Sequence, residues 1–149
     1  MKHLFFTLIF IILVIKGVAQ NEWIISNANN SVSDIVSGLP IYLYVKENGN
    51  HLTYKKRIDC GVNLDWKKEF RPTIIFYKEG GGPIKEGDRV AIHIERGGYL
   101  KYQQRSCGIN LSWDKNPNYE WEFNTEDIFL KTNKPVALFN LEANDYMVF

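Results

Sequence analysis

An internal repeat is the feature that most constrains how this chain can fold. The segment RIDCGVNLDW at residues 57–66 returns as RSCGINLSW at residues 105–113, and the alignment places Cys60 on Cys107. The tryptophan that ends each segment is followed ten residues later by a phenylalanine. Repeats with a period of about 20–50 residues are typical of folds that are assembled from similar units.

A third copy of the repeat begins later in the sequence. PVALFNLEANDYMVF at residues 135–149 resembles PIYLYVKENGNHLTY at residues 40–54 and RVAIHIERGGYLKY at residues 89–102. This copy holds only the first part of the unit, because no counterpart of GINLSW follows it. The sequence therefore contains two whole units and the beginning of another.

Each whole unit is predicted to form four short strands. Apolar and polar residues alternate over short runs that are bounded by turn residues, which is the pattern of half-buried strands. No segment shows a sustained helical period with capping residues. We therefore expect an all-β protein, with the strands of the two whole units at residues 41–45, 51–54, 62–66, 73–77, 90–94, 99–102, 109–113 and 119–123.

An N-terminal segment resembles the last strand of a unit. NEWIIS at residues 21–26 aligns with YEWEF at residues 119–123, so that Trp23 falls on Trp121. This strand and the partial third copy would together form one unit that lacks only its third strand. A ring of three units could then close, and closure removes exposed strand edges.

The three-unit pattern resembles the β-trefoil superfamily. The series VAIHIERGGYLKY…GINLSW…YEWEF is similar in rhythm to the repeats of its ricin-B lectin and fascin-like groups. The resemblance covers residues 21–149, but Asn-Leu-x-Trp stands where the ricin type has Gln-x-Trp. It implies a β-trefoil in which the N-terminal strand completes the C-terminal repeat and one strand is missing.

Residues 1–19 have the pattern of a secretory signal peptide. The apolar run Leu4–Ile15 has twelve residues, fewer than the about 20 that a membrane-spanning helix needs. We expect cleavage after Ala19, with an uncleaved anchor left open because Lys16 lies between the apolar run and the cut. Residues 20–149 are expected to form a single secreted domain, monomeric and not bound to a membrane.

The charge balance gives no reason to expect nucleic acid as a partner. Without Lys2 and Lys16, the 18 basic residues fall to 16 against 17 acidic ones, a formal charge of −1. A nucleic-acid-binding domain ordinarily carries a clear excess of basic residues.

The repeated segments also predict which side chains are buried. In an alternating strand, every second residue faces the same side. The residues expected to face inward and cap the barrel core, with the two tryptophans contributing most, are Val62, Leu64, Trp66, Ile109, Leu111 and Trp113.

The resemblance to trefoil lectins implies a non-catalytic, carbohydrate-binding module. Such lectins hold sugars with an acid or amide for the hydroxyl groups and an aromatic face for the ring, and guanidinium, amide and tyrosine groups are suited to this task. The candidate ligand-binding residues on the two hairpins are Tyr54, Arg57, Asn63, Asp65, Tyr102, Arg105, Asn110 and Ser112.

Two structural alternatives stay open for these candidates. Asn63 and Asn110 each follow a hairpin turn, where an asparagine often hydrogen-bonds the nearby backbone. Arg57 and Arg105 could pair with surface carboxylates and have no other role.

The two cysteines give conflicting indications. An exported protein with two cysteines ordinarily has one disulfide. However, Cys60 and Cys107 are equivalent positions of the repeat. Equivalent Cα atoms about 5.5 Å apart would each lie about 3 Å from a threefold axis, which is crowded for hairpin turns. We therefore expect unpaired thiols, with a disulfide as the alternative.

Signals for catalysis are weak. After residue 19 the chain has only His51, expected at a turn, and His93, expected to face solvent from a strand. No pair of acid and base groups with a shared site and no metal-ligand spacing is apparent. We expect no enzymatic activity, no cofactor and no metal.

A protein-binding trefoil is the second functional class, for example a secreted protease inhibitor that acts through one exposed loop. The long connections at residues 67–72, 78–89 and 124–135 could serve, with Arg71-Pro72 or Lys78 presenting a basic side chain. Residues 27–38 are expected to form a further polar loop.

Overall fold

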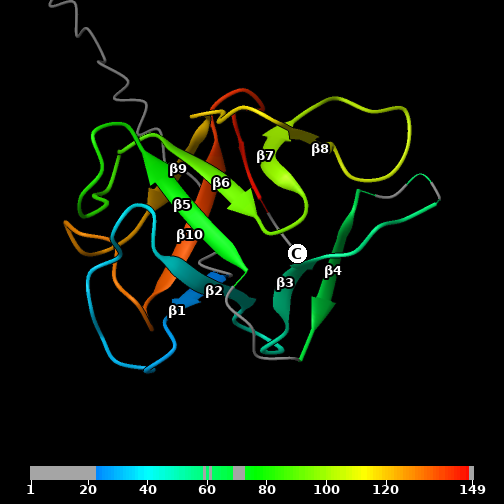
Figure 1. Ribbon diagram of the computed structural model, residues 1–149. Coiled ribbons are helices and arrows are strands. Elements are labelled where there is room, and N and C mark those ends of the chain that lie inside the picture. Colours follow the sequence, from blue (N-terminus) through cyan, green and yellow to red (C-terminus); the bar gives the residue numbers. More distant parts are fainter. Residues whose placement is uncertain (1–22, 59, 61, 69–72, 148–149) are drawn as a thin grey trace, which may run out of the picture.

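The computed structural model describes residues 23–58, 60, 62–68 and 73–147 (Figure 1). The expected signal peptide and the dipeptide Arg71-Pro72 lie outside these residues. The described part of the chain is all-β. It includes no helix, and therefore no helix that is long and apolar enough to cross a membrane. The prediction of an all-β protein is confirmed.

Within the described residues, eleven strands form one continuous antiparallel sheet. In chain order they are β1 (Trp23–Ser26), β2 (Pro40–Val45), β3 (His51–Tyr54), β4 (Leu64–Lys67), β5 (Ile74–Lys78), β6 (Val90–Ile94), β7 (Gly98–Tyr102), β8 (Leu111–Asp114), β9 (Trp121–Asn124), β10 (Pro135–Asn140) and β11 (Asp145–Tyr146).

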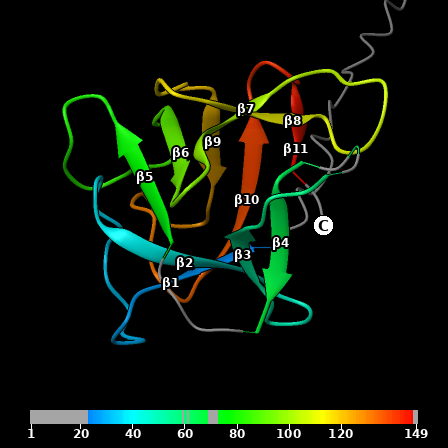
Figure 2. The same ribbon diagram turned by 45° about the vertical axis from the view of Figure 1, so that its right-hand side comes forward.

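Six of these strands close into a barrel (Figures 1 and 2). The ring runs β1, β2, β5, β6, β9, β10 and returns to β1, and all of its neighbours are antiparallel. The closing contact aligns Trp23 with Val136 and Ile24 with Pro135. The predicted meeting of the N-terminal strand with the third repeat is therefore confirmed.

Each unit sends a hairpin or a part of one away from this barrel. In the first unit (β2–β5) it is β3 and β4, in the second unit (β6–β9) it is β7 and β8, and in the third unit (β10, β11 and β1) it is β11 alone. The registers correspond, because His51 lies opposite Tyr44, Tyr99 opposite His93, and Tyr146 opposite Phe139. Ring centroids in these pairs are 5.3, 5.0 and 5.0 Å apart.

The barrel interior is filled by the inward-facing residues of all six strands. Trp23, Trp121, Phe76 and Phe123 are at most 1% exposed, and the two phenylalanine rings meet edge to face with centroids 4.7 Å apart. Burial of each such side chain contributes about 2–3 kcal/mol to folding. Strand alternation explains this core, since polar or half-buried residues separate the buried ones along β5 and β9.

Three connections close one end of the barrel by a cyclic set of hydrogen bonds. Ile35 N donates to Leu130 O, Leu130 N to Ile84 O, and Ile84 N to Ile35 O, at 2.8–2.9 Å. The three side chains are at most 2% exposed. The segments that contain them were expected to be polar or flexible loops, but each carries one apolar residue into the core.

The third strand of each whole unit begins later than its alternation predicted. Ile109 was expected to face inward and is instead 46% exposed. The reason is a tight turn before β8, in which Leu111 N donates to Ile109 O at 2.8 Å, so residue 109 precedes the regular strand. Val62, Leu64 and Leu111 are buried as expected, while Trp66 and Trp113 pack against the core but stay half-buried.

Candidate functional site

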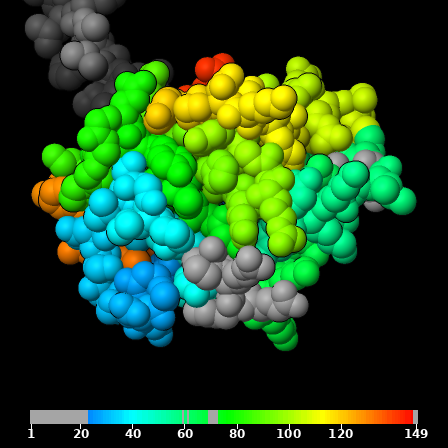
Figure 3. Space-filling model, in the orientation of Figure 1, coloured from blue at the N-terminus to red at the C-terminus, as the bar shows by residue number. Residues whose placement is uncertain are grey.

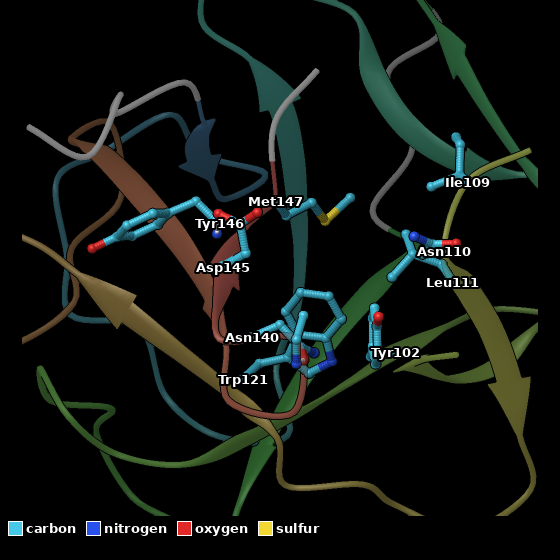
Figure 4. A pocket seen from close by; sticks show the side chains of 10 residues that line it. Tyr102, Ile109, Asn110, Leu111, Trp121, Asn140, Asp145, Tyr146 and Met147 are labelled. Atoms are coloured by element: carbon cyan, nitrogen blue, oxygen red, sulfur yellow. Dashed lines mark hydrogen bonds between the residues drawn. The ribbon is translucent and has the colours of Figure 1, made fainter. Parts of the chain in front are cut away.

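An open pocket lies between the hairpin of the second unit and β11 of the third (Figure 4). Its volume is about 280 Å³. Ile109 and Asn110 from the turn before β8 stand on one side, Asp145 and Met147 on the other, and Tyr102 lies between them. The remaining lining residues are Leu111, Trp121, Asn140, Ala143 and Tyr146.

The floor of the pocket is rigid because its polar groups are hydrogen-bonded. Trp121 Nε1 donates to Leu100 O at 2.9 Å. Asn140 donates to Glu120 Oε1 at 3.0 Å and accepts from Ala143 N at 2.8 Å. Glu120 Oε1 also accepts the backbone N–H of Tyr102. These bonds hold the side chains that surround the ring of Tyr102.

The rim offers polar groups of three kinds. Asn110 uses its Oδ1 to accept the N–H of Arg105 at 3.1 Å and is exposed. Asp145 is exposed and accepts the N–H of Tyr146 at 2.8 Å through Oδ1. The third group is the hydroxyl of Tyr102. The ring of Tyr146 points away from the pocket, where its hydroxyl accepts from Asn124 at 2.6 Å (Figure 4).

The equivalent place in the first unit is closed by an indole. Tyr54, the counterpart of Tyr102, contacts Trp113 of the second unit edge to face, with ring centroids 5.8 Å apart. Gly97 lies beside both rings, and a Cβ at that position would stand 2.9 Å from each of them. Asn63 accepts from Arg57 N at 2.8 Å and donates to the hydroxyl of Tyr54 at 3.4 Å. These contacts pack Tyr54 and Asn63 against their neighbours.

The structure therefore divides the eight predicted ligand-binding residues. Tyr102 and Asn110 line the pocket, whereas Arg105 and Ser112 do not. The four first-unit residues are brought together, but by packing and hydrogen bonds of their own hairpin. Both asparagines accept a backbone N–H across the turn, as one of the structural alternatives predicted.

The two arginines hold the hairpin loops. Arg57 Nε donates to Leu64 O at 3.0 Å, and its guanidinium lies 3.6 Å from Asp65. Arg105 Nη2 donates to Cys60 O at 3.0 Å, a bond from the second hairpin to the first. Arg57 therefore pairs with a nearby carboxylate, as the other structural alternative predicted.

Cys60 and Cys107 form a disulfide, so the expectation of unpaired thiols was wrong. Their Cα atoms are 5.9 Å apart, within the usual range for this bond. The expectation assumed three hairpins crowding one axis, but among the described residues the hairpin strands of the third unit amount to the two residues of β11. The first two hairpin loops therefore have room to lean together, and they lie next to each other on the right of Figure 3.

The histidines pack against aromatic neighbours, His51 from hairpin strand β3 and His93 from barrel strand β6. His51 is buried and packs beside Tyr42 and Tyr44, and His93 is half-buried beside Tyr99. The expectation that His93 faces solvent was wrong, because the hairpin strand covers it. Burial lowers the pKa of both imidazoles from the ordinary value of 6.5.

Lys78 does not present a free basic side chain. Its ammonium lies 2.8 Å from Asp88 and donates to Pro83 O at 2.6 Å, which ties the connection at residues 78–89 to the barrel. A hollow of about 290 Å³ beside this ion pair is lined by charged residues and Tyr119. Among the described residues, no three His, Cys, Asp or Glu side chains are grouped as a metal site.

Sequence reasoning missed Asn140, Ala143, Asp145 and Met147 as pocket residues. The signal that could have found them is the alignment of the third repeat with the other two, since the pocket opens beside β11, where the described residues include no counterpart of β4 and β8. Comparisons with protein-family models, curated proteins and solved structures found no match.

Proposed function

We propose that the protein is a secreted, non-catalytic carbohydrate-binding module whose ligand site is the pocket beside Tyr102. We also propose that its closed barrel with hairpin extensions is a β-trefoil, in which the described residues of the third repeat include no third strand. The barrel closure, the matching registers of β3, β7 and β11, and the cyclic bonds of Ile35, Ile84 and Leu130 support this assignment. Export is supported by the apolar N-terminal segment and by the disulfide.

The chemistry of the pocket suits a sugar ring. The ring of Tyr102 offers an apolar face on which C–H groups can pack, while Asn110 and Asp145 offer an amide and a carboxylate for hydroxyl groups. The volume of about 280 Å³ is near the lower end of the about 300–1,000 Å³ of small-molecule sites. We therefore expect one sugar residue to occupy the pocket, with further residues of a longer glycan in solvent.

One observation carries the proposal. Of the two equivalent tyrosines, Tyr54 is covered by Trp113, whereas Tyr102 opens onto a pocket. The same pair of residue types, Tyr and Asn, is therefore structural in the first unit and available to a ligand in the second. We expect one sugar site for each chain.

A glycan array with the purified protein tests this proposal. We expect binding of a defined group of glycans, which Tyr102→Ala reduces by at least about tenfold and Asn110→Ala reduces less. Gln103→Ala is the matched control, because Gln103 follows Tyr102, is exposed and does not line the pocket. Binding of no glycan, or binding that ignores both pocket substitutions, would refute the proposal.

A further inference from the structure

The pocket corresponds to a position that a tryptophan fills elsewhere in the molecule. Tyr54 ends its pairing opposite Leu64, and Tyr102 ends its pairing opposite Leu111, so the two tyrosines are equivalent. Trp113 of the following unit packs against Tyr54. The residue that would pack against Tyr102 in the same way belongs to the third strand of the third unit, and the described residues contain no such strand.

The strand edge beside the pocket is also unmatched in the described residues. In the second unit, β7 pairs with β6 through one edge and with β8 through the other. In the third unit, β11 pairs with β10 as β7 does with β6, and none of the other described strands pairs with its second edge. That edge lies along the pocket, because Asp145 and Tyr146 both line it.

We propose that β11 and the pocket together bind an extended peptide with the pattern Gly-apolar-Asn-Leu-x-Trp. The peptide adds to β11 as an antiparallel strand, in the manner of strand addition at an open sheet edge. Its tryptophan enters the pocket against Tyr102. This proposal goes beyond the sugar function and does not rest on it.

The internal copies show what each position of such a peptide does. The leucine is buried, as Leu64 and Leu111 are. The asparagine closes its own turn by accepting a backbone N–H, as Asn63 and Asn110 do. The residue between leucine and tryptophan is half-buried and tolerates change, since Asp65 stands there in one copy and a serine in the other.

The third unit has a turn that is compatible with an indole beside it. Six residues lie between the paired Phe139 and Tyr146, as between the paired Tyr44 and His51, and Asn144 takes the positive φ of 53° where Gly49 takes 68°. In the first unit, Trp66 packs against the core opposite Leu52, near the start of β3. An indole at the equivalent place of the third unit therefore does not need a glycine beside it, as Trp113 does at Gly97.

A labelled peptide that copies residues 104–116, which keeps the Arg105 N–H that Asn110 accepts, with Cys107→Ser to prevent exchange, is the direct probe. Fluorescence anisotropy with the purified protein is expected to show saturable binding. The same peptide with Trp113→Ala should bind at least about tenfold more weakly, because the indole is the anchor. A peptide N-methylated at its Asp114 position should also lose affinity, since Asp114 pairs with Tyr99 in β7 and the copy would pair with Tyr146.

Protein variants locate the binding. Tyr102→Ala and Ala143→Trp, the latter adding an indole at the pocket rim, are each expected to weaken peptide binding by at least about tenfold, while Gln103→Ala leaves it unchanged. Tyr102→Ala removes side-chain volume at the pocket, whereas Ala143→Trp adds it. A far-UV circular dichroism spectrum checks that each variant is folded. Ala143→Trp therefore tests the inference even where Tyr102→Ala unfolds.

Three results would overturn the inference. They are failure of the protein to bind the peptide, equal binding of the tryptophan and alanine peptides, and binding that is indifferent to Ala143→Trp in a folded protein. Sugar binding is measured separately on the glycan array, so the failure of either proposal is distinguishable from the failure of the other. A sugar and the peptide bound to Tyr102 at the same time would also contradict a shared pocket.

Discussion

Trp23 Nε1 donates a hydrogen bond to Met147 O at 2.9 Å, which ties the first described residue of the chain to the last. The same bond occurs inside the second unit, where Trp121 Nε1 donates to Leu100 O at 2.9 Å. Trp23 and Met147 thus take the positions of Trp121 and Leu100 in a unit built from both ends of the described chain. The contact that closes the barrel therefore also joins the two parts of the third repeat unit. The pocket lies beside this contact, since Met147 lines it.

Trp23→Phe should weaken this closure. The substitution removes the N–H donor and part of a fully buried ring, which together cost about 2–4 kcal/mol. Urea unfolding measures the change in the free energy of unfolding, and Trp121→Phe, which breaks the equivalent bond, should show a similar loss. A change below about 0.5 kcal/mol for Trp23→Phe would contradict a closed barrel.

Gly97→Ala should be destabilising for a steric reason. A Cβ at Gly97 would stand 2.9 Å from both Trp113 and Tyr54, and forcing extra volume into such a contact costs about 1–3 kcal/mol. Trp113→Leu frees space, so the double variant should lose less than the sum of the two single losses. A double-mutant cycle by urea unfolding checks this, and simple additivity would show that the two residues do not press on each other.

The disulfide should stabilise the folded chain. Cys60 and Cys107 are 47 residues apart, and the chain-entropy account gives about 4 kcal/mol for closing a loop of that length. The double variant Cys60→Ser/Cys107→Ser should lower the free energy of unfolding by this amount in oxidising buffer. Free thiols detected in the native protein would contradict the bond.

Stability should fall on mild acidification. Burial lowers the pKa of His51 and His93 below 6.5 in the folded chain, so the unfolded chain binds protons first as the pH falls. The stability that the neutral imidazoles contribute is complete above pH 6.5 and is lost as the pH decreases through the folded pKa. Urea unfolding at about pH 7.5 and about pH 5.5 should show the drop, and His93→Gln should reduce it. An unfolding free energy that is the same at both values would contradict this interpretation.

The titration of Asp88 and Asp114 does not overlap the pH range in which the histidines change charge. The pKa values of Asp88 and Asp114 are lowered from 3.8, so these groups change charge at a lower pH than the histidines. Far-ultraviolet circular dichroism at each pH is the control that the starting state is folded.

The repeat made much of the fold predictable. Trp23 could be placed beside the third unit because NEWIIS resembles YEWEF, and the strands followed from alternation. The sequence did not predict the cyclic hydrogen bonds and the burial of Ile35, Ile84 and Leu130, because a single apolar residue in a polar loop forms no periodic pattern. Ile109 was misplaced for a related reason, since alternation does not continue through the turn before β8.

The site was predictable only in part. Tyr102 and Asn110 carry a recognisable pattern on a hairpin, but the sequence does not distinguish them from Tyr54 and Asn63. The difference comes from Trp113, a residue of another unit that covers one tyrosine and leaves the other open. The disulfide was missed because exact symmetry was assumed, whereas the described residues of the third unit include β11 and no second hairpin strand.

The central claim is that the second-unit pocket is open to ligand and its first-unit counterpart is closed. Its most direct test is a backbone amide NMR titration of the labelled protein with the glycan that the array selects. The account predicts saturable chemical-shift changes at Tyr102, Asn110, Asp145 and Tyr146, and unchanged signals at Tyr54 and Asn63. Shifts confined to the first unit, shifts away from both places, or no binding would contradict it.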